Sequence, residues 1–232
     1  MINLIEVTGR IKVYFNQIEG LEPQSYMEKY LEELREIEEY IDFKGGSHTF
    51  KNGSISIFQY PSKIDEEISM IWRFSKVKDL EFIDKLFKTA LKFNDKCFIS
   101  ISIKDNIDFN RLKSWIKSYS LKWLGESGES FSAIIDFGGQ ILWLTAYTNR
   151  NIFNIRGKFR LDGLKPSKII RILCEGETLK VLSVRVPSPI KHSYIQNANR
   201  LGLTASELIR EALKKYLIEL YKSDIEELTK IE

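Results

Sequence analysis

The residues best suited to chemistry lie near the C-terminus, where polar and apolar side chains alternate. In an extended chain every second side chain points to the same side. One side of this run would carry Val181, Ser183 and Arg185, and the other Leu182, Val184 and Val186. On a two-stranded ribbon, an arginine can enter the major groove of B-DNA, about 12 Å wide, and form two hydrogen bonds to guanine. We therefore treat Arg185, Ser183 and Val181 as candidate base-reading residues.

Two helices are expected to hold this strand in place. Pro187 cannot continue a strand, and Ser188 followed by Pro189 predicts a helix start with a side-chain cap. That helix should run to about Leu201, where Gly202 is suited to a left-handed C-terminal cap.

A capping box, Thr204-Ala205-Ser206-Glu207, predicts the start of a second helix. Amides at a helix N-terminus attract anions. The candidate phosphate-binding residues are therefore Thr204, Ala205 and Ser206, with Lys180 as a nearby cation. The segment from Lys180 to Lys215 has seven basic and two acidic residues, an excess of cations typical of nucleic-acid surfaces.

The strand and the two helices form an incomplete unit. A lone strand leaves backbone groups unpaired on both edges, and two helices bury too little apolar surface to be stable. A two-fold dimer solves both problems, because the strand pairs with its copy and four helices close over the ribbon. The expected dimer core comprises Leu182, Val184, Val186, Leu208, Ile209 and Leu213.

The segment at about 180–217 resembles the ribbon-helix-helix superfamily that includes MetJ, Arc and CopG. The similarity rests on VLSVRVP, then eleven residues, then NRLGLTASELIREAL. It implies a homodimer or higher homo-oligomer that binds double-stranded DNA through the polar strand residues. Val181 replaces the polar residue usual at its position, so it would contact a thymine methyl group or contribute nothing to base preference.

The rest of the chain has the pattern of an α+β fold with a mainly antiparallel sheet. Strands are expected over residues 2–15, 54–60, 98–103, 131–136, 141–147, 152–162 and 167–174, and 68–74 could be strand or buried helix. Helices are expected from Pro23 to Ile41 and over 80–93 and 108–119. Asn52-Gly53 and Gly138-Gly139 predict hairpin turns. Two halves of similar element order suggest a duplicated unit, although no residues match between them.

Punctuating glycines and prolines predict a domain boundary between Gly163 and Thr178. We expect an α+β domain over 1–175, a DNA-binding module over 179–222 and a tail over 223–232. The first domain would serve oligomerisation, partner binding or ligand sensing.

Several other classes of function lack support in the sequence. Two distant cysteines, Cys97 and Cys174, and two isolated histidines make no zinc pattern, and no motif for a nucleophile, metal or cofactor is present. No apolar run is long enough to span a membrane, so we expect a cytoplasmic protein. The glutamate-rich segment 28–39 is expected to be a solvated helix face.

The sequence therefore favours a non-enzymatic, sequence-specific DNA-binding regulator. Two alternatives use the same C-terminal module. One is a nuclease or nickase that the module targets to DNA, and the other is a plasmid-partition or DNA-organising protein. Aromatic residues such as Trp115 and Trp123, which interleave with Lys113, Lys117 and Lys122, could provide an auxiliary DNA contact.

Overall fold

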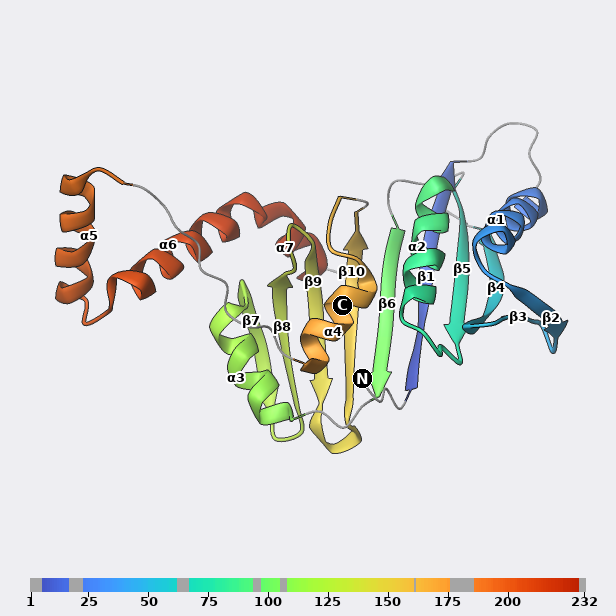
Figure 1. The fold of residues 1–232 in the computed structure, drawn as a ribbon, viewed down its shortest axis with the longest axis horizontal. Helices are drawn as coiled ribbons and strands as arrows, with labels where there is room; N and C mark the ends of the chain where they lie inside the picture. Colours follow the sequence, from blue (N-terminus) through green and yellow to red (C-terminus); the bar gives the residue numbers. More distant parts are fainter. Residues whose placement is uncertain are drawn as a thin grey trace. The chain divides into compact units, whose positions relative to one another are not determined.

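A computed structural model describes residues 6–16, 23–61, 67–93, 97–104, 108–160, 162–175 and 186–229. The chain divides into two compact units, an N-terminal unit up to Gly176 and a C-terminal unit from Glu177 (Figure 1). No described helix is both long and apolar enough to cross a membrane.

The N-terminal unit contains one ten-stranded sheet whose neighbouring strands are all antiparallel, which confirms the α+β prediction. Its first half consists of β1 (Glu6–Asn16), α1 (Pro23–Ile37), β2 (Tyr40–Lys44), β3 (Ser47–Phe50), β4 (Gly53–Pro61), β5 (Glu67–Ser75) and α2 (Glu81–Phe93). The second half consists of β6 (Cys97–Lys104), α3 (Phe109–Tyr119), β7 (Lys122–Ser127), β8 (Ser130–Asp136), β9 (Ile141–Tyr147), the 3-10 turn η1 (Thr148–Arg150), β10 (Ile152–Phe159) and α4 (Pro166–Glu175).

These two halves repeat one arrangement. Each runs strand, helix, four strands, helix, and the sheet order is β2-β3-β4-β5-β1-β6-β10-β9-β8-β7. The order on one side of the β1–β6 pair mirrors the order on the other side, and β1 and β6 are antiparallel. The halves are therefore related by an approximate two-fold axis between β1 and β6. The duplication suspected from element order is present in the topology.

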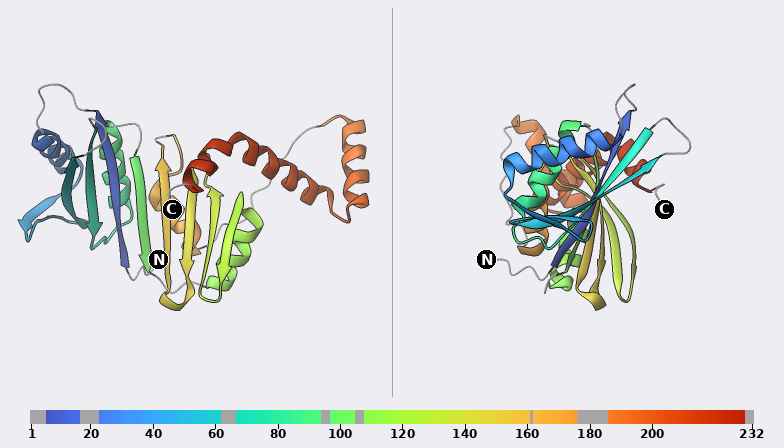
Figure 2. Two further views of the ribbon diagram at one scale, coloured as in Figure 1. Left: turned by 180° about the vertical axis from the view of Figure 1, so that it is seen from behind. Right: turned by 90° about the vertical axis from the view of Figure 1, so that its right-hand side faces the viewer.

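All four helices of this unit pack on one side of the sheet (Figure 2). Burial on β6 alternates, so that Cys97, Ile99, Ile101 and Ile103 are buried and the residues between them are not. These buried side chains belong to the same core cluster as apolar residues of α1, α2, α3 and α4. We call the opposite side of the sheet the open face, since no helix of the N-terminal unit covers it.

Two predicted segments were wrong. Residues 167–174 form helix α4 rather than a strand, because Pro166 starts a helix whose residues Ile169, Ile170 and Leu173 face the core. The first helix ends at Ile37, and Ile41 lies in strand β2. Gly45 and Gly46, which have positive φ angles, form the β2–β3 turn instead of ending a helix. Strand β7 was not predicted at all.

The β3–β4 hairpin is one residue out of its predicted position. Phe50 pairs with Gly53, so the two turn residues are Lys51 and Asn52 rather than Asn52 and Gly53. The glycine serves packing here, because a Cβ atom at Gly53 would lie 2.3 Å from the ring of Phe82. The ambiguous segment 68–74 is part of strand β5, and the turn at Gly138-Gly139 joins β8 and β9 as predicted.

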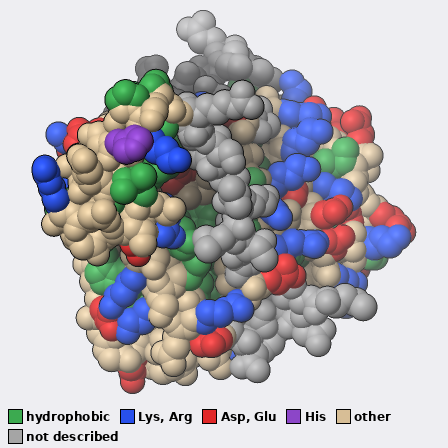
Figure 3. Space-filling view, turned by 60° about the vertical axis from the view of Figure 1, so that its left-hand side comes forward, with side chains coloured by type: hydrophobic (Ala, Val, Ile, Leu, Met, Phe, Trp, Pro, Cys, Tyr) green, Lys and Arg blue, Asp and Glu red, His purple; other side chains and the backbone are tan. Residues whose placement is uncertain are grey.

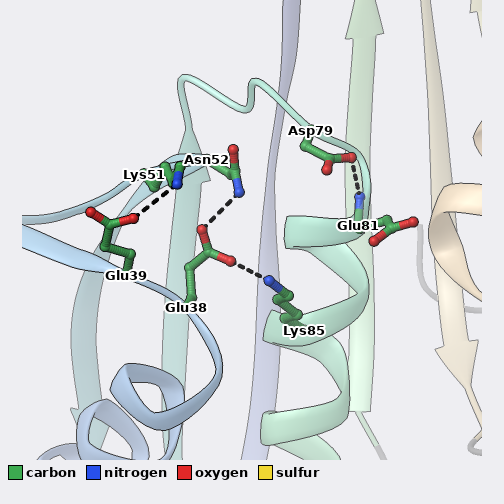
Figure 4. Close-up of polar contacts among 7 residues, drawn as sticks. All are labelled: Glu38, Glu39, Lys51, Asn52, Asp79, Glu81 and Lys85. Carbon is green, nitrogen blue, oxygen red and sulfur yellow. Dashed lines mark hydrogen bonds and ion pairs between the residues drawn. The ribbon is translucent and has the colours of Figure 1, made fainter.

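A buried carboxylate joins three elements of the first half (Figure 4). Glu38 follows α1 and is 5% exposed. Its two oxygens accept hydrogen bonds from Asn52 Nδ2, in the β3–β4 turn, and from Lys85 Nζ, on α2. The next residue, Glu39, pairs with Lys51, but both of these side chains are about two-thirds exposed. Only the Glu38 pair is therefore expected to contribute much to stability.

The C-terminal unit consists of three helices among its described residues, α5 (Ser188–Arg200), α6 (Ala205–Leu220) and α7 (Lys222–Thr229). The segment expected as a tail thus forms helix α7 up to Thr229. Pro187 is the N-cap of α5, and no side chain caps this end, so the predicted Ser188 cap is wrong. The Ser188 carbonyl oxygen lies 2.9 Å from His192 Nδ1, one turn along the helix.

Candidate nucleic-acid interface

The predicted base-reading strand lies outside the described residues. This applies to the base-reading residues Val181, Ser183 and Arg185, to the phosphate ligand Lys180, and to Leu182 and Val184 of the expected dimer core. Val186, the last residue of that run, is described and is 46% exposed. The described residues of the C-terminal unit therefore include the helices of the expected module but not its strand.

The capping box is formed as predicted. Thr204 Oγ1 accepts a hydrogen bond from the Glu207 amide at 3.2 Å, and Glu207 Oε2 accepts one from the Thr204 amide at 2.7 Å. The amide and the hydroxyl of Thr204 both donate to this carboxylate, and these two bonds hold the pKa of Glu207 below its usual value. The amides of Ala205 and Ser206 lie at the start of the sixteen-residue helix α6, the position suited to a phosphate.

Gly202 ends α5 in the predicted way. Its φ angle is +68°, in the left-handed region that favours glycine. The amide of Leu203 donates to the Ala198 carbonyl at 2.9 Å, the six-to-one bond of a Schellman motif. Ala198, 1% exposed, is the one described residue of α5 and α6 that is fully buried.

Apolar side chains of α5 and α6 lie at the surface of the single chain. The exposed ones are Ile190, Tyr194, Ile195, Leu201, Ile209, Leu213, Tyr216 and Leu220, and Leu208 is only partly buried. Figure 3 shows hydrophobic side chains at the molecular surface. Of the expected dimer core, Ile209 and Leu213 are each 44% exposed. Exposed apolar surface of this extent is typical of a protein interaction site, so we expect these helices to pack against a partner.

A second candidate surface is on the open face of the N-terminal unit, and the sequence did not indicate it. Strand register places Arg73 opposite Arg10, Arg10 opposite Ser100, and Ser100 opposite Arg156. Directly paired residues project from the same face of a sheet. Three arginines from β5, β1 and β10 thus lie in one line across the centre of the sheet. We call Arg73, Arg10, Ser100 and Arg156 the arginine row.

Cations also flank the arginine row. On the central strands β5, β1, β6 and β10, the described cations of the open face are Arg73, Arg10, Lys12, Lys104, Arg156 and Lys158. Register also assigns two carboxylates to this face of these strands, Glu6, opposite Lys104, and Glu67, opposite Asn16 at the far end of β5. Small polar side chains, Thr8, Ser100, Ser102 and Asn154, lie between them. This arrangement provides charge and hydrogen-bond donors for phosphate groups.

The arginine row is not neutralised by carboxylates within the described part of the chain. None of the three arginines forms an ion pair there, whereas Arg73 lies over the ring of Phe58 and Arg156 over that of Trp143, at 4.9 and 4.0 Å from the ring centroids. Like charges directly opposite each other, such as Arg10 and Arg73, destabilise a sheet. Such an arrangement is characteristic of a surface that binds an anion.

Two of the three lysines proposed for an auxiliary DNA contact are otherwise occupied. Lys113 and Lys117 on α3 both pair with Glu126 of β7, and Lys117 also lies over the Trp123 ring. Trp123 stacks on Phe131 on the helical side of the sheet. Of the cysteines, Cys97 is buried and Cys174 partly buried, and neither is in a disulfide bond. The described residues contain no group of three or more side chains that could hold a metal ion.

Comparisons with known proteins do not bear on this interface. No family model, no curated protein and no solved structure matches the chain.

Proposed function

We propose that this protein binds double-stranded DNA as a homodimer and acts as a regulator without catalytic activity. Sequence-specific contacts would come from a ribbon-helix-helix module at the C-terminus, with Arg185 and Ser183 in the major groove. The capped start of α6 would bind a backbone phosphate. The resemblance of residues 180–217 to that superfamily and the exposed apolar side chains of α5 and α6 support this part of the proposal.

The open face would provide a second contact that does not depend on sequence. The observation that carries this part is the arginine row, three arginines aligned by strand register with no carboxylate partner among the described residues. Contacts to phosphates fix the register of a protein on DNA, whereas contacts to base edges specify the sequence. The two surfaces would therefore have different roles, the row in affinity and the ribbon in specificity.

Selection of bound sequences from a pool of random duplexes tests this function. The full chain should enrich a short repeated site, and footprinting should show protection of that site without cleavage when Mg²⁺ is present. Arg185→Ala should bind the selected site and a random duplex equally, because the bidentate contact to guanine is lost. Equal enrichment by wild type and Arg185→Ala would contradict base reading by this strand.

Cleavage or nicking of the duplex would instead support the targeted-enzyme alternative. Failure of the wild-type chain to bind any duplex at low salt would refute the proposed function as a whole.

A further inference from the structure

A basic groove lies on the helical side of the N-terminal unit, away from the open face. It is formed between α2 and α4 and has a volume of about 710 Å³. Six cations line it, Lys85, Lys88, Arg160, Lys165, Lys168 and Arg171. The carboxylates in its lining are Glu81 and Asp84. Apolar residues, which dominate small-molecule pockets, contribute only Phe87 and Pro166.

Part of this charge is already neutralised within the chain. Lys85 pairs with Glu38, and Arg160 pairs with Asp162. Asp84 accepts hydrogen bonds from the amide and the hydroxyl of Ser167, at 2.9 and 2.5 Å. The side chains of Lys88, Lys168 and Arg171 form no ion pair or hydrogen bond with another described residue, and all three are exposed. They are the cations that an acidic partner would meet.

The chain itself carries a complementary acidic surface on α1. Glu28, Glu32 and Glu36 are spaced by four residues, are all exposed, and form no ion pair with another described residue. With 3.6 residues per turn they form one stripe, about 12 Å long, on the side of α1 opposite the buried Tyr30 and Leu34. The cations of the groove extend over a similar length, about 9 Å from Lys165, just before α4, to Arg171.

The stripe and the groove cannot meet within one chain. The buried side of α1 packs against α2, as shown by the hydrogen bond from Tyr30 Oη to the Leu86 carbonyl and by the ion pair of Glu33 with Lys92. The stripe, on the opposite side of α1, therefore points away from α2 and from the groove beyond it.

We propose that the groove between α2 and α4 binds the acidic stripe of α1 from a second copy of this chain. Complementary charges would pair Glu28, Glu32 and Glu36 with Lys88, Lys168 and Arg171. The groove also contains the carboxylate of Glu81, which a nucleic acid cannot pair with because it carries no cation. A second copy of the chain can pair with it through Lys29, which is exposed next to the stripe. Because the groove of one copy contacts the stripe of the next, the copies form either a closed ring or an open filament.

Charge reversal with complementation tests the proposal on the full chain. One variant reverses the groove (Lys88→Glu, Lys168→Glu and Arg171→Glu), and the other reverses the stripe (Glu28→Lys, Glu32→Lys and Glu36→Lys). At about 50 mM salt, where charges act over longer distances, sedimentation should show wild-type assemblies larger than a dimer. Each variant alone should associate about tenfold more weakly or worse, and an equimolar mixture of the two should regain association.

Three results would overturn the proposal. The first is a wild-type chain that forms nothing beyond a dimer at low salt. The second is a mixture that does not regain association although circular dichroism shows both variants folded. The third is a groove reversal that weakens association while the stripe reversal does not, because the groove then has another occupant. Neither reversal alters α5 or α6, so failure here leaves the proposed C-terminal dimer and its DNA binding unaffected.

Discussion

Removal of the three arginines of the arginine row gives the most direct test of the open face. We expect Arg10→Ala, Arg73→Ala and Arg156→Ala together to weaken binding to any duplex while preserving the preference for the selected site. Arg73 and Arg156 are three strand spacings apart, about 14 Å. That length of duplex axis carries about eight phosphate charges, enough to engage all three side chains.

The magnitude follows from counterion release. Each phosphate contact contributes about 0.9 to the slope of log affinity against log salt concentration, so loss of three contacts should make the slope shallower by about 2.7. Between about 50 and 200 mM salt, the affinity of the wild type should then fall about 40-fold more than that of the variant. Fluorescence anisotropy with a labelled random duplex at several salt concentrations measures both slopes.

A matched control separates the position of the charges from their number. Arg35→Ala, Lys78→Ala and Arg111→Ala remove the same number of charges from α1, the β5–α2 connection and α3, outside both the arginine row and the groove between α2 and α4. This control should keep the wild-type slope, because those side chains lie away from the open face. An unchanged slope in the row variant, or an equal change in the control, would refute the role of the open face.

The remaining predictions concern stability and assembly. Glu38→Ala should lower the free energy of unfolding by about 2–3 kcal/mol, since it leaves Lys85 and Asn52 without their buried acceptor, whereas Glu39→Ala should cause no measurable change in urea denaturation. Burial raises the pKa of Asp84, so its ionised form is disfavoured in the folded state and the wild type should lose stability as pH rises through that pKa. Asp84→Asn should lack this loss between acidic and neutral pH in parallel denaturation experiments, and identical pH profiles would contradict it. Polar substitution of Leu208 and Leu213 should convert the dimer to a monomer in analytical ultracentrifugation, and a dimer that persists would exclude α6 from the dimer core.

Local patterns in the sequence were enough to predict much of the secondary structure. The alternating run of β6, the amphipathic helix α2 and the capping box at Thr204 each depend on residues close together in the chain. Such signals are fixed by side-chain periodicity and by hydrogen bonds within a few residues. For the same reason Gly202 could be placed correctly at the end of α5.

Other elements depended on tertiary contacts. The segment 167–174 is apolar enough for either a strand or a helix, and packing of Ile169 and Leu173 against the core decided for helix α4. Gly53 looked like a turn residue, but the close approach of the Phe82 ring explains why glycine is needed there. Neither contact can be read from neighbouring residues.

The arginine row shows most clearly what the sequence alone could not determine. Arg10, Arg73 and Arg156 are separated by 63 and 83 residues, and each occupies an ordinary outward position of its own strand. Strand order and register place them in one line, because the duplicated halves bring β5, β1, β6 and β10 together at the centre of the sheet. The sequence by itself determined which side of each strand is polar, and the pairing of distant strands decided which polar side chains share a surface.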